Sequence, residues 1–224
     1  MMSPRTSILK RFSAVHLLIA LLLLFISCPF LLQLSSGKVI ESAMITLVLF
    51  SALFAISDRI SLIMGLILAL LALSGQWGTL FWKKNILDPL YLLPAIAFIL
   101  IVIYHLLRFT LKAKEVGIET ICASISGFLM MGLLWSRIYE FIGKLNPQAF
   151  AFQKPGDVMS SFTAFYFSFT SLTTIGFGDI TPVTPVARMM VVMEAVTGMF
   201  YMAVIVATLV SINATKILRK KAND

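Results

Sequence analysis

Long apolar runs separated by short polar breaks dominate the chain. Six of these runs approach the length of about 20 apolar residues that one helix needs to cross a bilayer core. They are residues 12–34, 39–57, 60–81, 89–109, 117–142 and 186–213. Polar stretches such as Ser57-Asp58-Arg59 divide neighbouring runs. The pattern therefore predicts an all-α membrane protein with six transmembrane helices.

One connection, residues 143–185, is too long and too mixed in character for a simple loop. A short helix is predicted within it from Asp157 to Thr173, because Pro155-Gly156 stops the preceding loop and Asp157 suits the capping position of a first turn. Aromatic residues recur there at helical spacing, at Phe162, Phe165, Tyr166 and Phe169. The helix is too short and too rich in Ser and Thr to cross, so we expect it to be re-entrant and shielded from lipid by protein.

The composition supports lipid as the natural solvent. Only 12% of the residues are charged, whereas a soluble domain carries about a quarter. The net charge of +8 raises the question of nucleic acid, but the basic residues lie at the ends of apolar runs. No stretch combines clustered Lys and Arg with aromatic residues on a polar background, so a nucleic-acid partner is not expected.

The distribution of basic residues predicts the orientation of the helices. With the N-terminus inside, the inner set comprises Arg5, Lys10, Arg11, Arg59, Arg108, Lys112, Lys114, Lys216, Arg219, Lys220 and Lys221. The outer loops hold Lys38, Lys83, Lys84, Lys144 and Lys154. This excess of inner charge favours a multi-pass protein with both termini in the cytoplasm. We expect the basic tail to lie against anionic lipid headgroups.

The first apolar run has a second interpretation as a signal peptide, because Arg5, Lys10 and Arg11 precede it. No small-residue cleavage pattern follows at Ser27-Cys28-Pro29-Phe30, and the apolar character continues through Leu34. We therefore expect a retained first helix.

Other side chains with reactive or charged groups fit packing roles. Cys28, Cys122, His16 and His105 lie within apolar runs and lack the spacing of a metal site. Arg137 and Glu140 are three residues apart, so we expect them to pair on a solvated or interfacial helix surface. Trp135 and Tyr139 near the same helix end suit an interfacial aromatic belt. No catalytic constellation appears at working spacing, and neither an enzyme nor a cofactor is expected.

The segment after the short helix carries the most specific chemistry. It reads Thr173-Thr174-Ile175-Gly176-Phe177-Gly178-Asp179. Glycine at alternate positions permits positive φ, and consecutive backbone carbonyls that point the same way replace the hydration shell of an ion. The side chains of Ile175 and Phe177 are then expected to pack away from the carbonyl row.

The stretch from Thr174 to Asp179 resembles the filter of the potassium-channel pore family, matching T-[VI]-G-[YF]-G-D at every position. The resemblance covers about residues 116–214 and implies a pore domain, residues 113–215, with an outer helix, a pore helix, a selectivity-filter loop and an inner helix. It implies K⁺ ligands at the Thr174 hydroxyl and at four backbone carbonyls. These belong to Thr174, Ile175, Gly176 and Phe177, with Gly178 completing the filter.

The resemblance also implies that Asp179, Tyr166 and Phe167 support the filter, and we expect Thr173 and Glu194 to support it too. Asp179 braces the outer mouth in such pores. Many family members place an aromatic residue with a polar group eight positions before the filter threonine, where Tyr166 stands here. Phe167 occupies the second aromatic place without a polar group, a departure that would weaken the bracing.

Two residues of the last apolar run keep more than one interpretation. Glu194 is a carboxyl in an apolar helix, which is costly in a membrane. We expect it to be protonated or hydrogen-bonded to a pore-helix hydroxyl such as Thr170 or Ser171; direct ion binding is the alternative. Gly198 stands where many family members carry a hinge glycine, and close packing against the pore helix accounts for it equally well.

The first four helices, within residues 12–112, lack the charge pattern of a voltage sensor, because Leu90 to Leu107 contain no Lys or Arg. We expect residues 1–11 to form a cytoplasmic N-terminus and residues 216–224 a basic cytoplasmic tail. After Ser211 only Ile212 to Asp224 remain, so we expect no nucleotide- or calcium-binding domain there. Control of gating would then need lipid, tension, pH or a separate partner. The sequence as a whole predicts the subunit of a homotetrameric potassium channel. A weakly selective cation channel, a transporter and a non-conducting accessory subunit are the alternatives.

Overall fold

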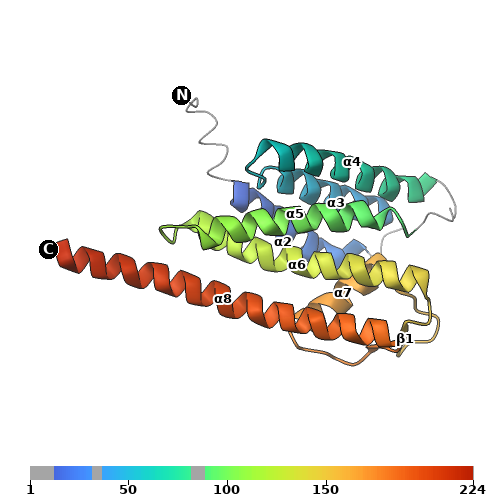
Figure 1. Cartoon of the computed structure of the whole chain (residues 1–224). Helices are drawn as coiled ribbons and strands as arrows, with labels where there is room; N and C mark the ends of the chain where they lie inside the picture. The colour runs from blue at the N-terminus through green and yellow to red at the C-terminus, as the bar shows by residue number, and fades with distance from the viewer. Residues whose placement is uncertain (1–12, 32–36, 82–88, 224) are drawn as a thin grey trace. The chain divides into compact units, whose positions relative to one another are not determined.

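The computed structural model describes residues 13–31, 37–81 and 89–223. Its elements, shown in Figure 1, are α2 (Ser13–Leu31), α3 (Gly37–Leu53), α4 (Arg59–Phe81), α5 (Leu92–Leu111), α6 (Ile118–Leu145), β1 (Phe150–Phe152), α7 (Ser161–Leu172), β2 (Ile180–Pro182) and α8 (Pro185–Asn223). The N-terminal segment 1–11 and the breaks at 32–36 and 82–88 lie outside the described residues. The side chains of the basic tail lie outside them too.

The described chain is mostly helical, as expected for a membrane protein. Four helical stretches are long and apolar enough to cross a bilayer: Arg59–Gly78, Leu92–Leu111, Ile118–Leu145 and Pro185–Ala214. The described apolar parts of α2 and α3, Ala14–Ser27 and Val39–Leu53, are shorter. These helices support the membrane class, whereas the count of six spans stays a prediction.

Helix starts follow local capping chemistry. Asp58 precedes α4, and its Oδ2 accepts a hydrogen bond from the Ser61 amide at 2.9 Å. Pro185 opens α8 at a position where its missing N–H costs nothing. The Thr184 carbonyl just before it accepts from the Arg188 amide at 3.0 Å. These residues fix where two of the predicted apolar runs become helical.

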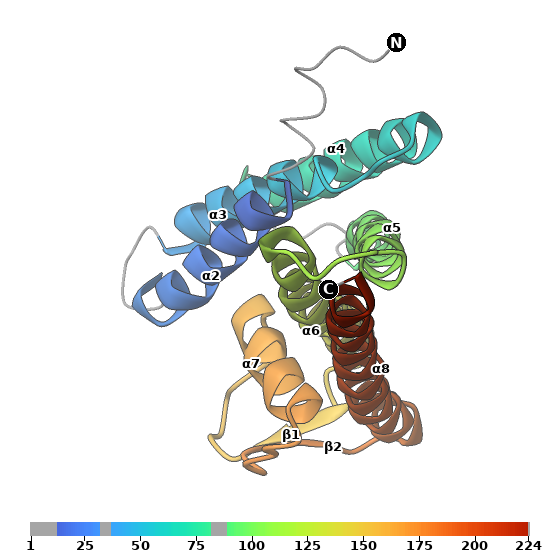
Figure 2. The same ribbon diagram turned by 90° about the vertical axis from the view of Figure 1, so that its left-hand side faces the viewer.

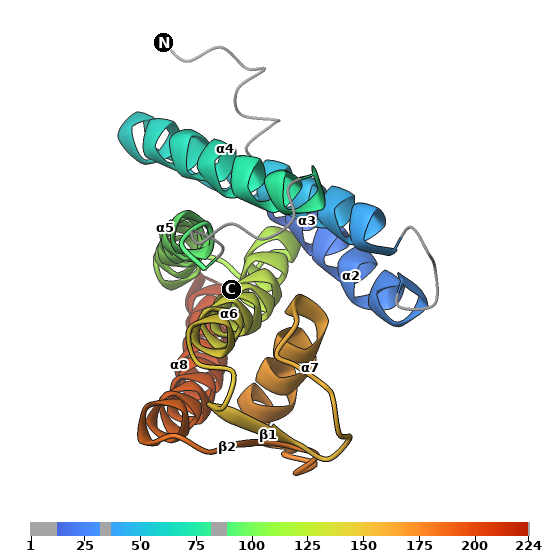
Figure 3. The same cartoon turned by 90° about the vertical axis from the view of Figure 1, so that its right-hand side faces the viewer.

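The described structure forms two compact units, each assembled from separate segments. One comprises the described residues within Met1–Ile63, Ile101–Leu129 and Phe200–Asp224, and the other comprises those within Met64–Leu100 and Met130–Met199. In the first unit, α2 runs alongside α3 (Figure 3). His105 is buried there, as expected of a packing residue, with Nε2 3.2 Å from Asp58 Oδ1. The second unit contains the glycine-rich motif.

In the second unit, β1 and β2 form an antiparallel pair beside α7 (Figure 2). Phe150 pairs with Pro182, and Phe152 pairs with Ile180. The pairing joins the chain just after the glycine-rich motif to the chain just after α6. The sequence did not predict this strand pair, because three-residue strands leave no periodic pattern.

An aromatic cluster forms the core of the second unit. The Tyr139 ring lies 5.1 Å from the Phe167 ring and 5.8 Å from the Phe150 ring, both in edge-to-face geometry. Tyr139 has no exposed surface, and Trp135 is 7% exposed. The prediction of an interfacial aromatic belt at these two residues is therefore wrong. Both are buried residues, and Tyr139 packs α6 against α7 and β1.

Candidate functional site

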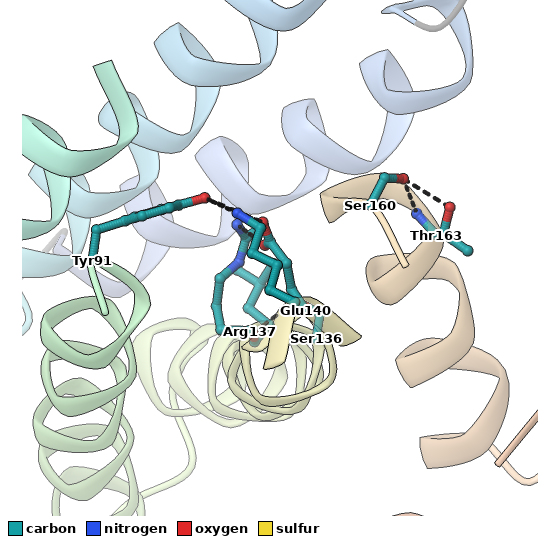
Figure 4. A network of polar contacts seen from close by, with 8 residues as sticks. Tyr91, Ser136, Arg137, Glu140, Ser160 and Thr163 are labelled. Carbon is teal, nitrogen blue, oxygen red and sulfur yellow. Dashed lines mark hydrogen bonds and ion pairs between the residues drawn. The ribbon is translucent and has the colours of Figure 1, made fainter. Parts of the chain in front are cut away.

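Helix α7 positions the glycine-rich motif. The helix begins later than predicted, because Ser160 rather than Asp157 is its N-cap. The Ser160 hydroxyl oxygen accepts from the Thr163 amide at 3.2 Å and lies 2.8 Å from the Thr163 hydroxyl (Figure 4). Met159, just before the cap, is buried against Gly143 of α6. This contact fixes the point at which the chain turns into the helix.

The C-terminal end of α7 runs directly into the motif. The Thr174 amide donates to the Ser171 carbonyl at 3.0 Å, and the Ile175 amide donates to the Thr170 carbonyl at 2.9 Å. This pair of bonds closes α7 as a Schellman motif, in which the residue after the C-cap takes a left-handed conformation. Thr174 is that residue, with φ of 60°. A β-branched side chain is strained there, by about 1–3 kcal/mol.

The backbone after α7 has the alternation that the glycine spacing predicts. Thr174, Gly176 and Gly178 have φ values of 60°, 53° and 80°, so every second residue is left-handed. The Gly176 amide also donates to the Thr170 carbonyl, at 3.1 Å. Three successive amides of the loop are thus turned back to α7, and the carbonyls of the loop stay available to a ligand.

The loop is exposed in the single subunit. Residues 173–178 all lie at the surface, with Ile175 57% and Phe177 68% exposed. The Phe177 ring lies parallel to the Tyr166 ring, with centroids 6.3 Å apart. Thr173, next to the loop, turns its hydroxyl back to the Phe169 carbonyl at 2.6 Å. The large apolar side chains of the loop therefore have little cover within their own chain.

Asp179 is held from three sides. Its Oδ2 accepts from the Tyr166 hydroxyl at 2.8 Å, and its Oδ1 accepts from the Ile180 amide at 3.1 Å. The Asp179 carbonyl accepts from the Gln153 amide at 2.8 Å. Desolvation, together with the bond to Asp179, raises the pKa of the Tyr166 phenol above its ordinary value, so Tyr166 remains the donor. The structure thus joins Tyr166 to Asp179, as anticipated from the sequence, whereas Phe167 packs in the aromatic core.

Glu194 is fully buried and is bonded to two other helices. Its Oε2 accepts from the Tyr139 hydroxyl of α6 at 2.5 Å, and its Oε1 lies 2.5 Å from the Ser168 hydroxyl of α7. A pore-helix hydroxyl was expected, but the choice of Thr170 or Ser171 is wrong. Thr170 instead donates to the Phe167 carbonyl at 2.9 Å.

Sequence reasoning missed Tyr139 and Ser168 as partners of this carboxyl. The helical period places Ser168 on a different side of α7 from Thr170. Which side meets α8 depends on how α7 docks on α6, where the Phe169 ring packs directly on Gly132. That docking leaves no signal in the local sequence.

Gly198 of α8 lies against the end of α7. A Cβ added to it would be 2.7 Å from Leu172 Cδ1 and 2.9 Å from the Leu172 carbonyl oxygen. Leu172 is two residues before Thr174. Close packing therefore accounts for this glycine in the structure, and a hinge role stays a prediction.

A second buried carboxylate, Glu140, lies in a cluster of charges at the end of α6 (Figure 4). Its oxygens lie 2.9 Å from the Arg137 guanidinium and 3.1 Å from Lys144 Nζ. The pairing of Arg137 with Glu140 is as predicted, but Glu140 is only 2% exposed, so the expectation of a solvated pair is wrong.

Tyr91 joins this cluster from the chain just before α5. Lys144 Nζ donates to its hydroxyl at 2.7 Å, and the hydroxyl donates to Glu140 Oε1 at 3.3 Å. Burial, reinforced by the Glu140 charge, raises the pKa of the Tyr91 phenol and keeps it neutral. The cluster ties the start of α5 to α6.

The described residues contain no group of three or more His, Cys, Asp or Glu side chains that could hold a metal ion. The available ligands for a cation at the exposed loop are backbone carbonyls and the Thr174 hydroxyl. A family model described as "Ion channel" matches residues 127–214, which include most of α6, all of α7, the loop and α8 up to Ala214. Comparison with the curated proteins and with the solved structures gave no match.

Proposed function

Residues 127–214 form a pore module of the ion-channel family, and from this premise we propose that the chain is the subunit of a potassium-selective channel. The family assignment indicates a channel rather than an enzyme. In the proposed pore, K⁺ loses its water and binds the carbonyls of Thr174, Ile175, Gly176 and Phe177. The Thr174 hydroxyl supplies the innermost ligand, and Gly178 ends the row.

The backbone of the loop is the observation that carries this proposal. Left-handed residues at 174, 176 and 178 alternate with the others, and the first three amides bond back to α7. An amide facing the conduction path would repel a cation, whereas carbonyl oxygens facing it would attract one. The match to T-[VI]-G-[YF]-G-D supports K⁺ as the cation.

The exposure of the loop supports an assembly of identical subunits. One chain supplies only one wall of a pore, and closed rotational symmetry around an axis supplies the others. The uncovered side chains of Ile175 and Phe177 offer apolar surface for such contacts. We propose a homotetramer, as the family resemblance implies.

The proposed placement is a multi-pass protein of the cell membrane with six spans, re-entrant α7 and both termini in the cytoplasm. In this arrangement the pore domain comprises residues 113–215, preceded by the four-helix region 12–112 and followed by the basic tail. The Arg and Lys count supports the orientation. The absence of Lys and Arg from Leu90 to Leu107 supports gating by something other than voltage sensing in α5.

Ion flux from liposomes tests the proposal with a matched pair of glycine variants. Gly176 and Gly156 both have positive φ, and a Cβ added to either meets nothing within 4 Å. Both Ala variants are therefore strained without a clash, but only Gly176→Ala alters the proposed filter. We expect K⁺ flux in the wild type and in Gly156→Ala, and its loss in Gly176→Ala. Undiminished flux in Gly176→Ala would contradict the assignment of the filter.

Reversal potentials under mixed Na⁺ and K⁺ gradients separate the proposal from a weakly selective cation channel. We expect a reversal potential close to that of K⁺, while equal permeability to both ions would favour the alternative. A transporter would show flux that saturates and depends on a coupled gradient. Native mass spectrometry of the purified protein measures the number of subunits directly.

A further inference from the structure

The contacts of Glu194 specify where its protons must lie. The carboxyl contacts hydroxyls on two other helices, Tyr139 and Ser168, each at 2.5 Å. The Ser168 hydroxyl oxygen also lies 2.8 Å from the Gly132 carbonyl oxygen of α6. Ser168 thus lies between two oxygens that both normally act as acceptors.

The three contacts among Tyr139, Glu194, Ser168 and Gly132 need three protons, whereas the two hydroxyls carry only two. A serine hydroxyl carries a single proton, and a backbone carbonyl carries none. If Ser168 donates to Gly132, its short contact with Glu194 needs a proton from the carboxyl. If Ser168 donates to Glu194 instead, its oxygen faces the Gly132 carbonyl at 2.8 Å with no proton between them. A protonated carboxyl gives each of the three contacts a proton of its own, whereas an ionised one leaves the single serine proton shared between two acceptors.

The surroundings of Glu194 agree with this count. Its side chain is fully buried, and among the described residues no Lys, Arg or His forms an ion pair with it. A buried carboxyl without a cation is more stable neutral than ionised. Glu140 is almost equally buried but lies beside Arg137 and Lys144. The chain therefore contains two buried glutamates in opposite environments.

We propose that Glu194 is a neutral carboxylic acid that accepts from Tyr139 and donates to Ser168, and that it acts as a positioning residue for the filter. This inference rests on the proposed function for its effect on conduction, but not for the protonation itself. Ser168 is six residues before Thr174 on the helix that ends in the filter. By tying α7 to α6 and α8, the neutral carboxyl fixes the position from which the filter backbone begins.

Substitution by glutamine tests the proposal, because an amide reproduces the neutral acid. Its NH₂ group donates to Ser168 and its carbonyl accepts from Tyr139, in nearly the same volume. We expect Glu194→Gln to fold and to retain wild-type K⁺ flux. Glu194→Ala leaves both hydroxyls without this partner, and we expect flux lower by about tenfold. Loss of flux or of folding in Glu194→Gln would show that the negative charge is required and would overturn the proposal.

Infrared spectroscopy of the purified protein reads the proton directly. A protonated carboxyl has a carbonyl stretch at higher frequency than a carboxylate. We expect this band at neutral pH in the wild type and in Glu140→Gln, and its loss in Glu194→Gln. A wild type without the band, or a band that persists in Glu194→Gln, overturns the inference. Absence of K⁺ flux in the wild type with the expected bands would contradict the proposed function and leave the protonation intact.

Discussion

Replacement of Gly198 by alanine separates the two interpretations of this residue. The added Cβ would lie 2.7 Å from Leu172 Cδ1 and 2.9 Å from the Leu172 carbonyl oxygen, well inside the favourable separation of about 3.5–4.0 Å between carbon atoms. The Leu172 side chain can adopt another rotamer, but the Leu172 carbonyl oxygen belongs to the last turn of α7, and the helix fixes its position. Either α8 or the end of α7 must therefore move.

The sign of the stability change follows from two opposing terms. Overpacking of this kind costs about 1–3 kcal/mol, and alanine in place of glycine within a helix returns up to about 1 kcal/mol. Close packing therefore predicts a net destabilisation of about 0–3 kcal/mol per subunit. A solvated hinge predicts the opposite sign, because only the gain in helix propensity remains.

Thermal unfolding of the purified protein in detergent measures this sign. We expect a lower midpoint for Gly198→Ala, and a double variant with Leu172→Ala that is less destabilised than the sum of the two single variants, by about 1 kcal/mol. Gly117→Ala is a control for the added methyl group alone, because Gly117 lies just before α6 and a Cβ there meets nothing within 4 Å. A raised midpoint in Gly198→Ala, with additive behaviour in the double variant, would refute the packing account and favour the hinge.

Three further substitutions probe other contacts. Tyr166→Phe removes the bond to Asp179, which is worth about 1 kcal/mol in this partly exposed setting; we expect K⁺ flux that declines faster in low K⁺ than in the wild type, and an unchanged decline would contradict the bracing role. Gly127→Ala places a Cβ against the Tyr201 hydroxyl, so we expect destabilisation that Tyr201→Phe partly relieves; equal midpoints with and without Tyr201→Phe would count against this contact. Glu140→Ala leaves Arg137 and Lys144 without their carboxylate, and we expect the free energy of unfolding to fall by about 3 kcal/mol. This is the lower end of the range for a broken buried ion pair, because Lys144 is partly exposed. A loss below about 1 kcal/mol would mean that solvent already screens the cluster.

Much of the helical framework follows from local chemistry in the sequence. The lengths of the apolar runs predict α4, α5, α6 and α8, because a single segment can satisfy all its backbone hydrogen bonds within a bilayer only as a helix. The alternation of glycine predicts left-handed residues in the loop, since the necessary φ values are open to few other residues. These features need only a short stretch of chain to be recognised.

The remainder depends on how helices dock, which a single sequence does not encode locally. Asp157 and Ser160 are equally good capping residues, and the burial of Met159 against Gly143 decides between them. Tyr139 is of a residue type common at membrane interfaces, yet its hydroxyl on α6 donates a hydrogen bond to Glu194 on α8. In both cases a tertiary contact overrides a correct local propensity.

The chain itself fixes the backbone of the proposed filter loop, but it leaves the large apolar side chains of the loop uncovered. The amides of Thr174, Ile175 and Gly176 are already bonded to α7, and Asp179 is bonded to Tyr166. By contrast, Ile175 and Phe177 remain largely exposed. Assembly would therefore change the surroundings of these two side chains more than the path of the backbone. A subunit that is unable to assemble should therefore keep the loop conformation but be unable to form the proposed ring of carbonyls, and we expect it not to bind K⁺.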